Sequence, residues 1–188
     1  MGGGASKQGL KKGQIQKLVK ETGFSESEIQ YLFLRFQTLC ANGSCLSKQD
    51  IERDSNLKAN PYILRVFNTM PKNGTGEVVF ETFIRTASIF REGQDIKKKL
   101  KYIFGLFDYN MDDVLDSDEI KTMISAFHPG ISNEVCDEMV KKTIQEVACF
   151  SRKSQSDGKI RGDDFIAYAE QLPGIEKLLV LNLASDVS

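Results

Sequence analysis

The stretch Asp108-Tyr109-Asn110-Met111-Asp112-Asp113-Val114-Leu115-Asp116-Ser117-Asp118-Glu119 decides the fold of this chain. A twelve-residue calcium loop places oxygen ligands at positions 1, 3, 5, 7 and 9, and a bidentate glutamate at position 12. Here these positions hold, in order, Asp108, Asn110, Asp112, the backbone carbonyl of Val114, Asp116 and Glu119. The stretch therefore predicts one calcium site. Magnesium is the alternative ion, but a bidentate glutamate suits the larger calcium better.

One residue departs from this pattern. Position 6 of such a loop is usually a glycine, because the chain makes a sharp turn there, and this chain has Asp113. A left-handed backbone costs a non-glycine residue roughly 1–2 kcal/mol, and aspartate is among the side chains that tolerate it best. We expect a weaker calcium affinity and no loss of binding.

A repeat extends this unit over most of the chain. An apolar residue inside a polar loop is followed five residues later by a large apolar residue, in the pairs Leu46 and Ile51, Val78 and Phe83, Leu115 and Ile120, Ile160 and Phe165. Eleven residues before the loop position stand Phe67, Phe104 and Cys149, while Phe36 stands ten residues before Leu46. The repeat predicts four helix-loop-helix units, the first with a loop one residue short.

Helix signals flank these loops. Ser25 and Glu28 have the spacing of a capping box, and Ile96, Leu100 and Ile103 continue an apolar stripe through Phe107. We expect an all-α fold of two lobes, each holding two paired units with short antiparallel loop pairing. The predicted segments are a basic N-terminal part at 1–20, lobes at 21–92 and 93–172 joined near Arg91 to Asp95, and an apolar tail at 173–188.

The other three loops lack the ligands that a cation needs. The fourth loop has Lys153 at position 1, and a cation in place of the first carboxylate repels a metal. The second has Pro71 at position 1 and offers no carboxylate at its ligand positions, and the first, from Leu39 to Asp50, has lost a residue and its acids. One working site in four loops is the prediction.

Composition excludes several classes of protein. With 25 basic and 26 acidic residues in 188, the net charge is −1, which argues against nucleic-acid binding. Four cysteines without a dense pattern predict free thiols, and a single histidine, His128, argues against an enzyme. The start lacks the apolar core of a secretory signal, and we expect a cytoplasmic protein.

The two ends carry separate signals. Gly2 after the initiator methionine, with Ser6 beyond it, fits the template for N-myristoylation, and residues 1–20 contain five lysines and no acid. Together these predict attachment to the cytoplasmic face of a membrane, because one acyl chain alone binds weakly. The tail at 173–188 either covers a groove or is a plain terminal element, and Lys97, Lys98 and Lys99 are interpreted as a solvated helix face.

The chain also resembles a known family. The resemblance rests on Met1-Gly2, Lys20 to Ser25, Arg35-Phe36, Leu57 to Pro61, Arg65 to Phe67, Phe83 to Arg85 and Phe107 to Glu119. These stretches are similar to those of the calcineurin-B-like EF-hand family, which comprises the calcineurin B, calcineurin-B-homologous and calcium-and-integrin-binding groups. The resemblance implies an N-myristoylated, non-enzymatic subunit that holds an amphipathic helix of a larger client. Calcineurin B would imply four intact loops, so the client stays open among a phosphatase catalytic chain, an ion exchanger, a channel and an integrin tail.

An apolar groove for such a helix would be lined by inward faces of the helices, at Phe33, Phe36, Phe67, Phe83, Ile84 and Phe90. The leading hypothesis is a calcium-binding regulatory subunit or adaptor. The alternatives are a constitutive structural adaptor or chaperone subunit whose single metal is not a switch, and a calcium buffer.

Overall fold

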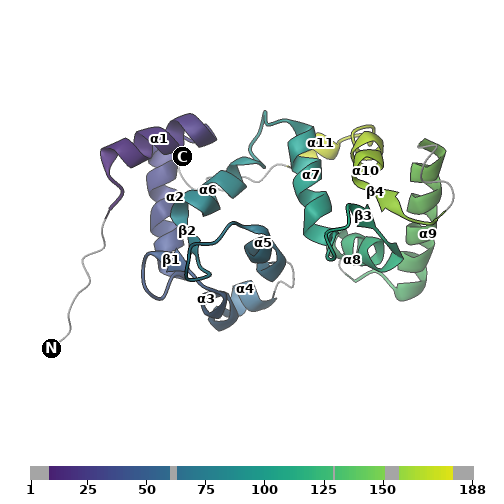
Figure 1. Ribbon diagram of the computed structural model, residues 1–188, viewed down its shortest axis with the longest axis horizontal. Helices are drawn as coiled ribbons and strands as arrows, with labels where there is room; N and C mark the ends of the chain where they lie inside the picture. Colours follow the sequence, from purple (N-terminus) through teal and green to yellow (C-terminus); the bar gives the residue numbers. More distant parts are fainter. Residues whose placement is uncertain (1–8, 60–62, 129, 151–156, 180–188) are drawn as a thin grey trace. The chain divides into compact units, whose positions relative to one another are not determined.

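The computed structural model describes residues 9–59, 63–128, 130–150 and 157–179 of the chain. These residues form two compact units, the first ending at Glu92 and the second beginning at Gly93 (Figure 1). Gly2, Lys153, Pro61 and most of the apolar tail lie outside the described residues. In the described part of the chain, no helix is both long and apolar enough to cross a membrane.

Each unit is built from two helix-loop-helix pairs. The first unit contains α1 (Lys12–Thr22), α2 (Glu26–Leu39), β1 (Cys45–Leu46), α3 (Lys48–Arg53), α4 (Ser55–Ala59), α5 (Ile63–Thr69), β2 (Val78–Val79) and α6 (Phe80–Ser88). The second contains α7 (Ile96–Phe107), β3 (Val114–Leu115), α8 (Ser117–Phe127), α9 (Asn133–Phe150), β4 (Ile160–Arg161), α10 (Gly162–Ala169) and α11 (Ile175–Leu178). The predicted all-α fold class is confirmed.

Two short antiparallel ladders join the loops in pairs. Strand β1 pairs with β2, with Leu46 opposite Val78, and β3 pairs with β4, with Leu115 opposite Ile160. These four residues occupy the loop position that defines the sequence repeat, and all four are buried. The sequence repeat therefore reflects packing, because each loop buries one apolar side chain at the ladder and leaves its polar side chains at the surface.

The helix signals are also seen. Ser25 caps α2 by accepting the backbone N–H of Glu28, whose carboxylate accepts the N–H of Ser25 at 2.7 Å. In the first unit the ring of Phe36 packs against Phe80, with 5.6 Å between centroids, and in the second Phe104 packs against Phe165 at 5.7 Å. Each unit thus has its own aromatic core.

One repeat position differs from its counterparts, and one expectation about a side chain is wrong. Cys149 is exposed, whereas Val147, two residues earlier on α9, is fully buried and takes the core position. Lys99 is 3% exposed, although Lys97 and Lys98 are exposed as expected. Lys99 lies three residues after Ile96 and four before Ile103, so its aliphatic stem lies beside the apolar stripe of α7.

Helix α1 lies mostly within the segment that the sequence indicated only as basic. Ile15 and Leu18 are buried and belong to the core of the first unit. The helix ends at Gly23, whose φ of 72° suits glycine, and the Arg91 guanidinium donates to the carbonyl of Thr22 at 3.1 Å. Beyond its basic face, α1 is thus an integral part of the first unit.

Candidate metal centre

The loop Asp108–Glu119 joins two helices through their caps. Asp108 ends α7, and its N–H donates to the carbonyl of Phe104 at 3.0 Å. Asp116 begins α8, where its carboxylate accepts the N–H groups of Asp118 and Glu119, both at 2.9 Å. The backbone at two of the predicted ligands is therefore fixed by helix ends. Asp108 is the last residue bonded to α7, and the Asp116 carboxylate accepts backbone N–H groups at the start of α8.

The side chains between the caps turn toward the backbone of the loop. Asp108 accepts the N–H of Asp112 at 3.2 Å and that of Asp113 at 3.0 Å. Asn110 accepts the N–H of Asp112 at 3.1 Å, and Asp112 accepts that of Val114 at 3.0 Å. These bonds draw the oxygen-bearing side chains at positions 1, 3 and 5 into one concave loop.

Glu119 closes the loop from the other side. It is 5% exposed, and its two carboxylate oxygens accept the N–H of Tyr109 at 2.7 Å and the N–H of Asp116 at 3.1 Å. Burial raises the pKa of Glu119, and the carboxylates of Asp116, Asp108 and Asp112 raise it further, against the lowering effect of the bond from Asp116. No positively charged group is among the causes of this shift, and a buried carboxylate without a positive partner is costly.

The backbone of this loop is left-handed at two places. Asp113 has a φ of 60°, as position 6 requires, and Met111 has a φ of 56°. The strain at Asp113 was predicted from the sequence, and the one at Met111 was not. The Met111 side chain is 88% exposed, so no packing compensates its backbone conformation.

The donor set fits a hard cation. Asp108, Asn110, Asp112, Asp116 and Glu119 all supply oxygen, which calcium prefers over nitrogen or sulfur, and the Val114 carbonyl supplies another. Within the described residues, no three acidic, histidine or cysteine side chains are gathered closely enough to hold a metal ion. The oxygens of the predicted ligand side chains instead accept backbone N–H groups of the loop. To bind an ion, these side chains must give up the N–H groups and coordinate the metal.

The fourth loop supports this one directly. Val114 lies opposite Arg161 in the β3–β4 ladder, and the N–H of Gly162 donates to the carbonyl of Asp113 at 3.3 Å. A Cβ on Gly162 would lie 2.8 Å from the Asp113 carboxylate, so a larger residue there would require the Asp113 side chain to move. Arg161 in turn donates to Asp157 at 2.7 Å, a contact within the fourth loop.

The first loop shows what the same position does without a metal. Asp50 stands at position 12, is 4% exposed, and accepts the N–H groups of Ala41 and Ser47, each at 2.9 Å. Burial alone would raise the pKa of Asp50, but the bonds from Ser47 and Ala41 and the nearby Arg53 guanidinium outweigh it and hold that pKa below its usual value. Unlike Glu119, this carboxylate has a positive neighbour of the chain's own.

Comparison with known proteins agrees with this architecture. The chain is 29% identical to calcineurin B of Naegleria gruberi over 164 residues, which cover 86% of this chain and 90% of that protein. It is also 29% identical to calcineurin B type 1 of Dictyostelium discoideum over 175 residues, covering 92% of this chain and 94% of the relative. Calcineurin B of Schizosaccharomyces pombe is 27% identical over 153 residues, 80% of this chain and 85% of its own length.

These similarities, at 27–29% identity over most of the chain, support a calcineurin-B-like EF-hand family. No protein-family profile matches it. In EF-hand terms, α2–α3, α5–α6, α7–α8 and α9–α10 are the four hands. The third hand alone keeps a complete set of ligand residues in sequence.

The predicted groove residues differ in exposure. Phe36, Phe67 and Ile84 are buried in the core of the first unit, while Phe33 and Phe83 are partly exposed, as is Phe90. A cavity of about 720 Å³ lies beside Phe33. Its other apolar lining comes from the end of α2, from Leu10 and from the start of α6, and Phe80 among these carried no signal as a groove residue in the sequence.

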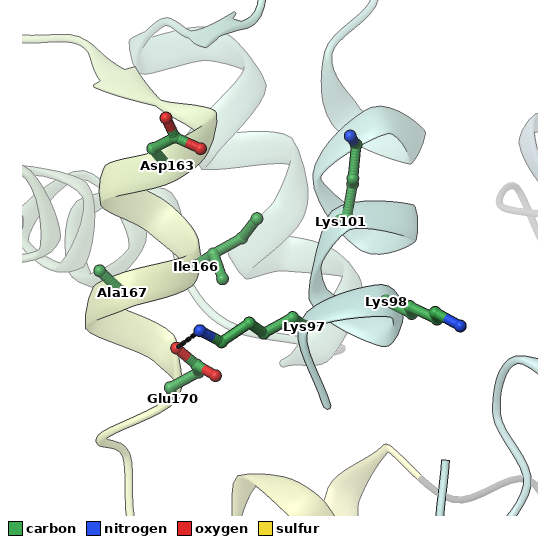
Figure 2. A pocket seen from close by; sticks show the side chains of 7 residues that line it. All are labelled: Lys97, Lys98, Lys101, Asp163, Ile166, Ala167 and Glu170. Carbon is green, nitrogen blue, oxygen red and sulfur yellow. Dashed lines mark ion pairs between the residues drawn. The ribbon is translucent and has the colours of Figure 1, made fainter. Parts of the chain in front are cut away.

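A second hollow, of about 310 Å³, lies between α7 and α10 of the second unit (Figure 2). Lys97, Lys98 and Lys101 line one side, and Glu170 on the other side pairs with Lys97 at 3.6 Å. Asp163 adds a further carboxylate. Because acids and bases nearly balance, this hollow is an ordinary solvated surface and carries no charge suited to an anion.

Proposed function

We propose that this protein is a calcium-binding regulatory subunit, without catalytic activity of its own, that holds an amphipathic helix of a larger client protein. The observation that carries the proposal is the buried Glu119 carboxylate, which no lysine or arginine pairs with in the described part of the chain. Burial and the charges of Asp116, Asp108 and Asp112 raise its pKa, and a divalent cation would supply the positive charge that this carboxylate lacks. Asp108, Asn110, Asp112, Val114, Asp116 and Glu119 would hold the ion, with calcium preferred over magnesium.

The chain's contribution to calcium binding is preorganisation. The two helix caps and the β3–β4 ladder hold the ligand residues in the loop before any ion arrives. The ion supplies the positive charge that offsets the converging carboxylates. We expect calcium to order the second unit rather than to create its fold.

The client site is proposed for the first unit, at the cavity beside Phe33. The partly exposed ring of Phe33, which packs on Phe80 with 5.0 Å between centroids, and the apolar start of α6 offer the kind of surface into which an amphipathic helix places its apolar face. The relatives are named as subunits of calcineurin, and this favours the catalytic chain of a phosphatase as the client over an exchanger, a channel or an integrin tail.

Co-expression with a calcineurin catalytic chain tests this proposal. A stable complex on size-exclusion chromatography, weakened at least tenfold by Phe33→Asp and unaffected by Leu34→Asp, supports it. Leu34 is the matched control because it is 60% exposed on the same helix and does not line the cavity. Absence of any complex with the catalytic chain would exclude that client, and equal effects of the two substitutions would exclude the groove.

Membrane attachment is part of the proposal. Lys11, Lys12, Lys17 and Lys20 are all exposed, so the basic face of the N-terminal region is accessible to anionic lipid. With a myristoyl group on Gly2, this face would hold the protein at the cytoplasmic side of a membrane. Co-sedimentation with phosphatidylserine vesicles, lost in a Gly2→Ala variant produced with an N-myristoyltransferase, is the expected result; equal sedimentation of both forms would contradict it.

The constitutive adaptor remains the second candidate, and the self-contained bonds of the first loop favour it. Client affinity measured with calcium and with a chelator separates the two. A change of tenfold or more supports regulation by calcium, and no change supports the adaptor.

A further inference from the structure

The first and third loops of this chain each hold a buried carboxylate at position 12, but the charges around the two carboxylates differ. At position 12, Asp50 accepts two backbone N–H groups, from Ala41 and Ser47, in the way that Glu119 accepts those of its own loop. Asp50 also receives the Arg53 guanidinium at 3.1 Å, from one turn along α3. The first loop therefore has a tethered cation at the carboxylate where the third loop requires a metal.

The second loop also has a tethered cation, at its entrance. The Lys72 ammonium group donates to the carbonyls of Phe67, Asn68 and Met70 at 2.9, 3.0 and 3.1 Å, and lies 4.8 Å from the centre of the Phe67 ring. These carbonyls belong to the C-terminal end of α5, where the helix dipole is negative. The single Lys72 ammonium group thus donates hydrogen bonds to three backbone carbonyls at the C-terminal end of α5.

Polar side chains complete the second loop without carboxylates at the ligand positions. Asn73 accepts the N–H groups of Thr75 and Glu77, at 3.0 and 2.9 Å, as Asp108 accepts N–H groups in the third loop. Glu77 then receives the side-chain amide of Asn42 at 3.3 Å, which links the second loop to the first beside the β1–β2 ladder. The two loops of the first unit form one bonded network.

From these contacts we propose that Arg53 takes the place of a metal in the first loop, while Lys72 and the Asn73 network hold the second loop without one. The paired loops, and the client cavity that they border, then keep one shape whether calcium is present or absent. Calcium acts on the second unit alone. This inference rests on the proposed function only in taking the cavity of the first unit as the client site.

Amide hydrogen exchange of the full chain, measured by NMR in a chelator, tests the role of Arg53. Arg53→Gln should speed exchange at the Ala41 and Ser47 amides about fivefold, the effect expected for a partly exposed charged pair, and Arg53→Lys should restore most of the protection. Lys48→Gln is the matched control, because Lys48 lies on the same helix and pairs with the exposed Glu52, at 3.6 Å, and not with Asp50. Equal exchange in the Arg53→Gln and Lys48→Gln variants would overturn the inference.

Calcium added to the wild-type chain gives the second test. Exchange at the Cys45 and Leu46 amides should change less than twofold, while exchange at Val114 and Leu115 should slow at least tenfold. A tenfold slowing in the first unit as well would refute the tethered cations. No change at Val114 and Leu115 would instead refute the calcium site, and the Arg53 comparison, made without calcium, would still decide this inference.

Discussion

Replacing Glu119 with glutamine removes one charge from the proposed metal centre and keeps the size of the side chain. A calcium ion and a carboxylate about 2.5 Å apart attract each other by about 3 kcal/mol even at the dielectric constant of water, which corresponds to an affinity loss of about a hundredfold or more. Glu119 is buried, so the true loss should not be smaller than this. We expect calcium binding by the variant to fall by at least that factor.

Thermal unfolding reports this loss. Calcium at about 100 times its dissociation constant stabilises the second unit by about 2.7 kcal/mol, or about 10–20 °C in Tm for a unit of roughly 90 residues. At the same calcium concentration the Glu119→Gln variant should gain only about 0.4 kcal/mol, a shift of about 2–3 °C. Calorimetric scans of both proteins, with calcium and with a chelator, measure the difference.

Asp50→Asn is the control, because it removes a charge from the equivalent position of the first loop with the same pattern of accepted N–H groups. It should lower stability by about 1 kcal/mol with and without calcium, through the weakened bonds and the lost Arg53 pair, and leave the calcium shift intact. A Glu119→Gln variant that keeps more than half of the wild-type calcium shift, or an Asp50→Asn variant that loses it, would refute the assignment of the site.

Three further predictions follow from single contacts, and a fourth from a pKa. Asp113→Gly should tighten calcium binding about fivefold in a calcium titration, because it removes roughly 1 kcal/mol of left-handed strain, and unchanged or weaker binding would contradict this. Gly162→Ala should change stability to urea by less than about 1 kcal/mol, because the Asp113 side chain can turn away from the new methyl group; a loss of more than about 2 kcal/mol would contradict this. Arg91→Ala should lower the free energy of unfolding by about 1–2 kcal/mol and speed amide exchange in α1. The reason is that Arg91 lies 4.6 Å from the centre of the Phe24 ring and donates to Thr22 in the last turn of α1. Unaltered exchange in α1 would argue against this contact. In acid, stability of the wild type should fall as the pH drops from about 4 through the lowered pKa of Asp50, since protonation removes its bonds, and the Asp50→Asn variant should lack this component of the pH profile.

The fold was predictable because its determinants repeat along the chain. Leu46, Val78, Leu115 and Ile160 recur at one place in each loop, and the structure pairs them in two ladders. Such a position must be apolar in every unit, so the pattern survives where the metal ligands are lost. In the fourth unit the buried residue Val147 lies two positions before Cys149, which holds the repeat position.

Features that depend on long-range contacts were not predictable in the same way. Helix α1 is part of the first unit because Ile15 and Leu18 pack in the core of that unit. In addition, Arg91 donates to Thr22 at the end of α1, and these two residues are 69 positions apart in the sequence. The pair of Arg53 with the position-12 carboxylate of Asp50 is different, because it is a local i, i+3 contact on α3 whose spacing the sequence does contain.

The central claim is that one loop of this chain, Asp108 to Glu119, binds calcium and the other three do not. Isothermal titration of the metal-free, full-length protein with calcium, at physiological ionic strength, tests it most directly. We expect one calcium ion per chain, with no detectable binding to the Glu119→Gln variant at the same concentrations. Two or more ions per chain, or a single ion still bound by the variant, would contradict it.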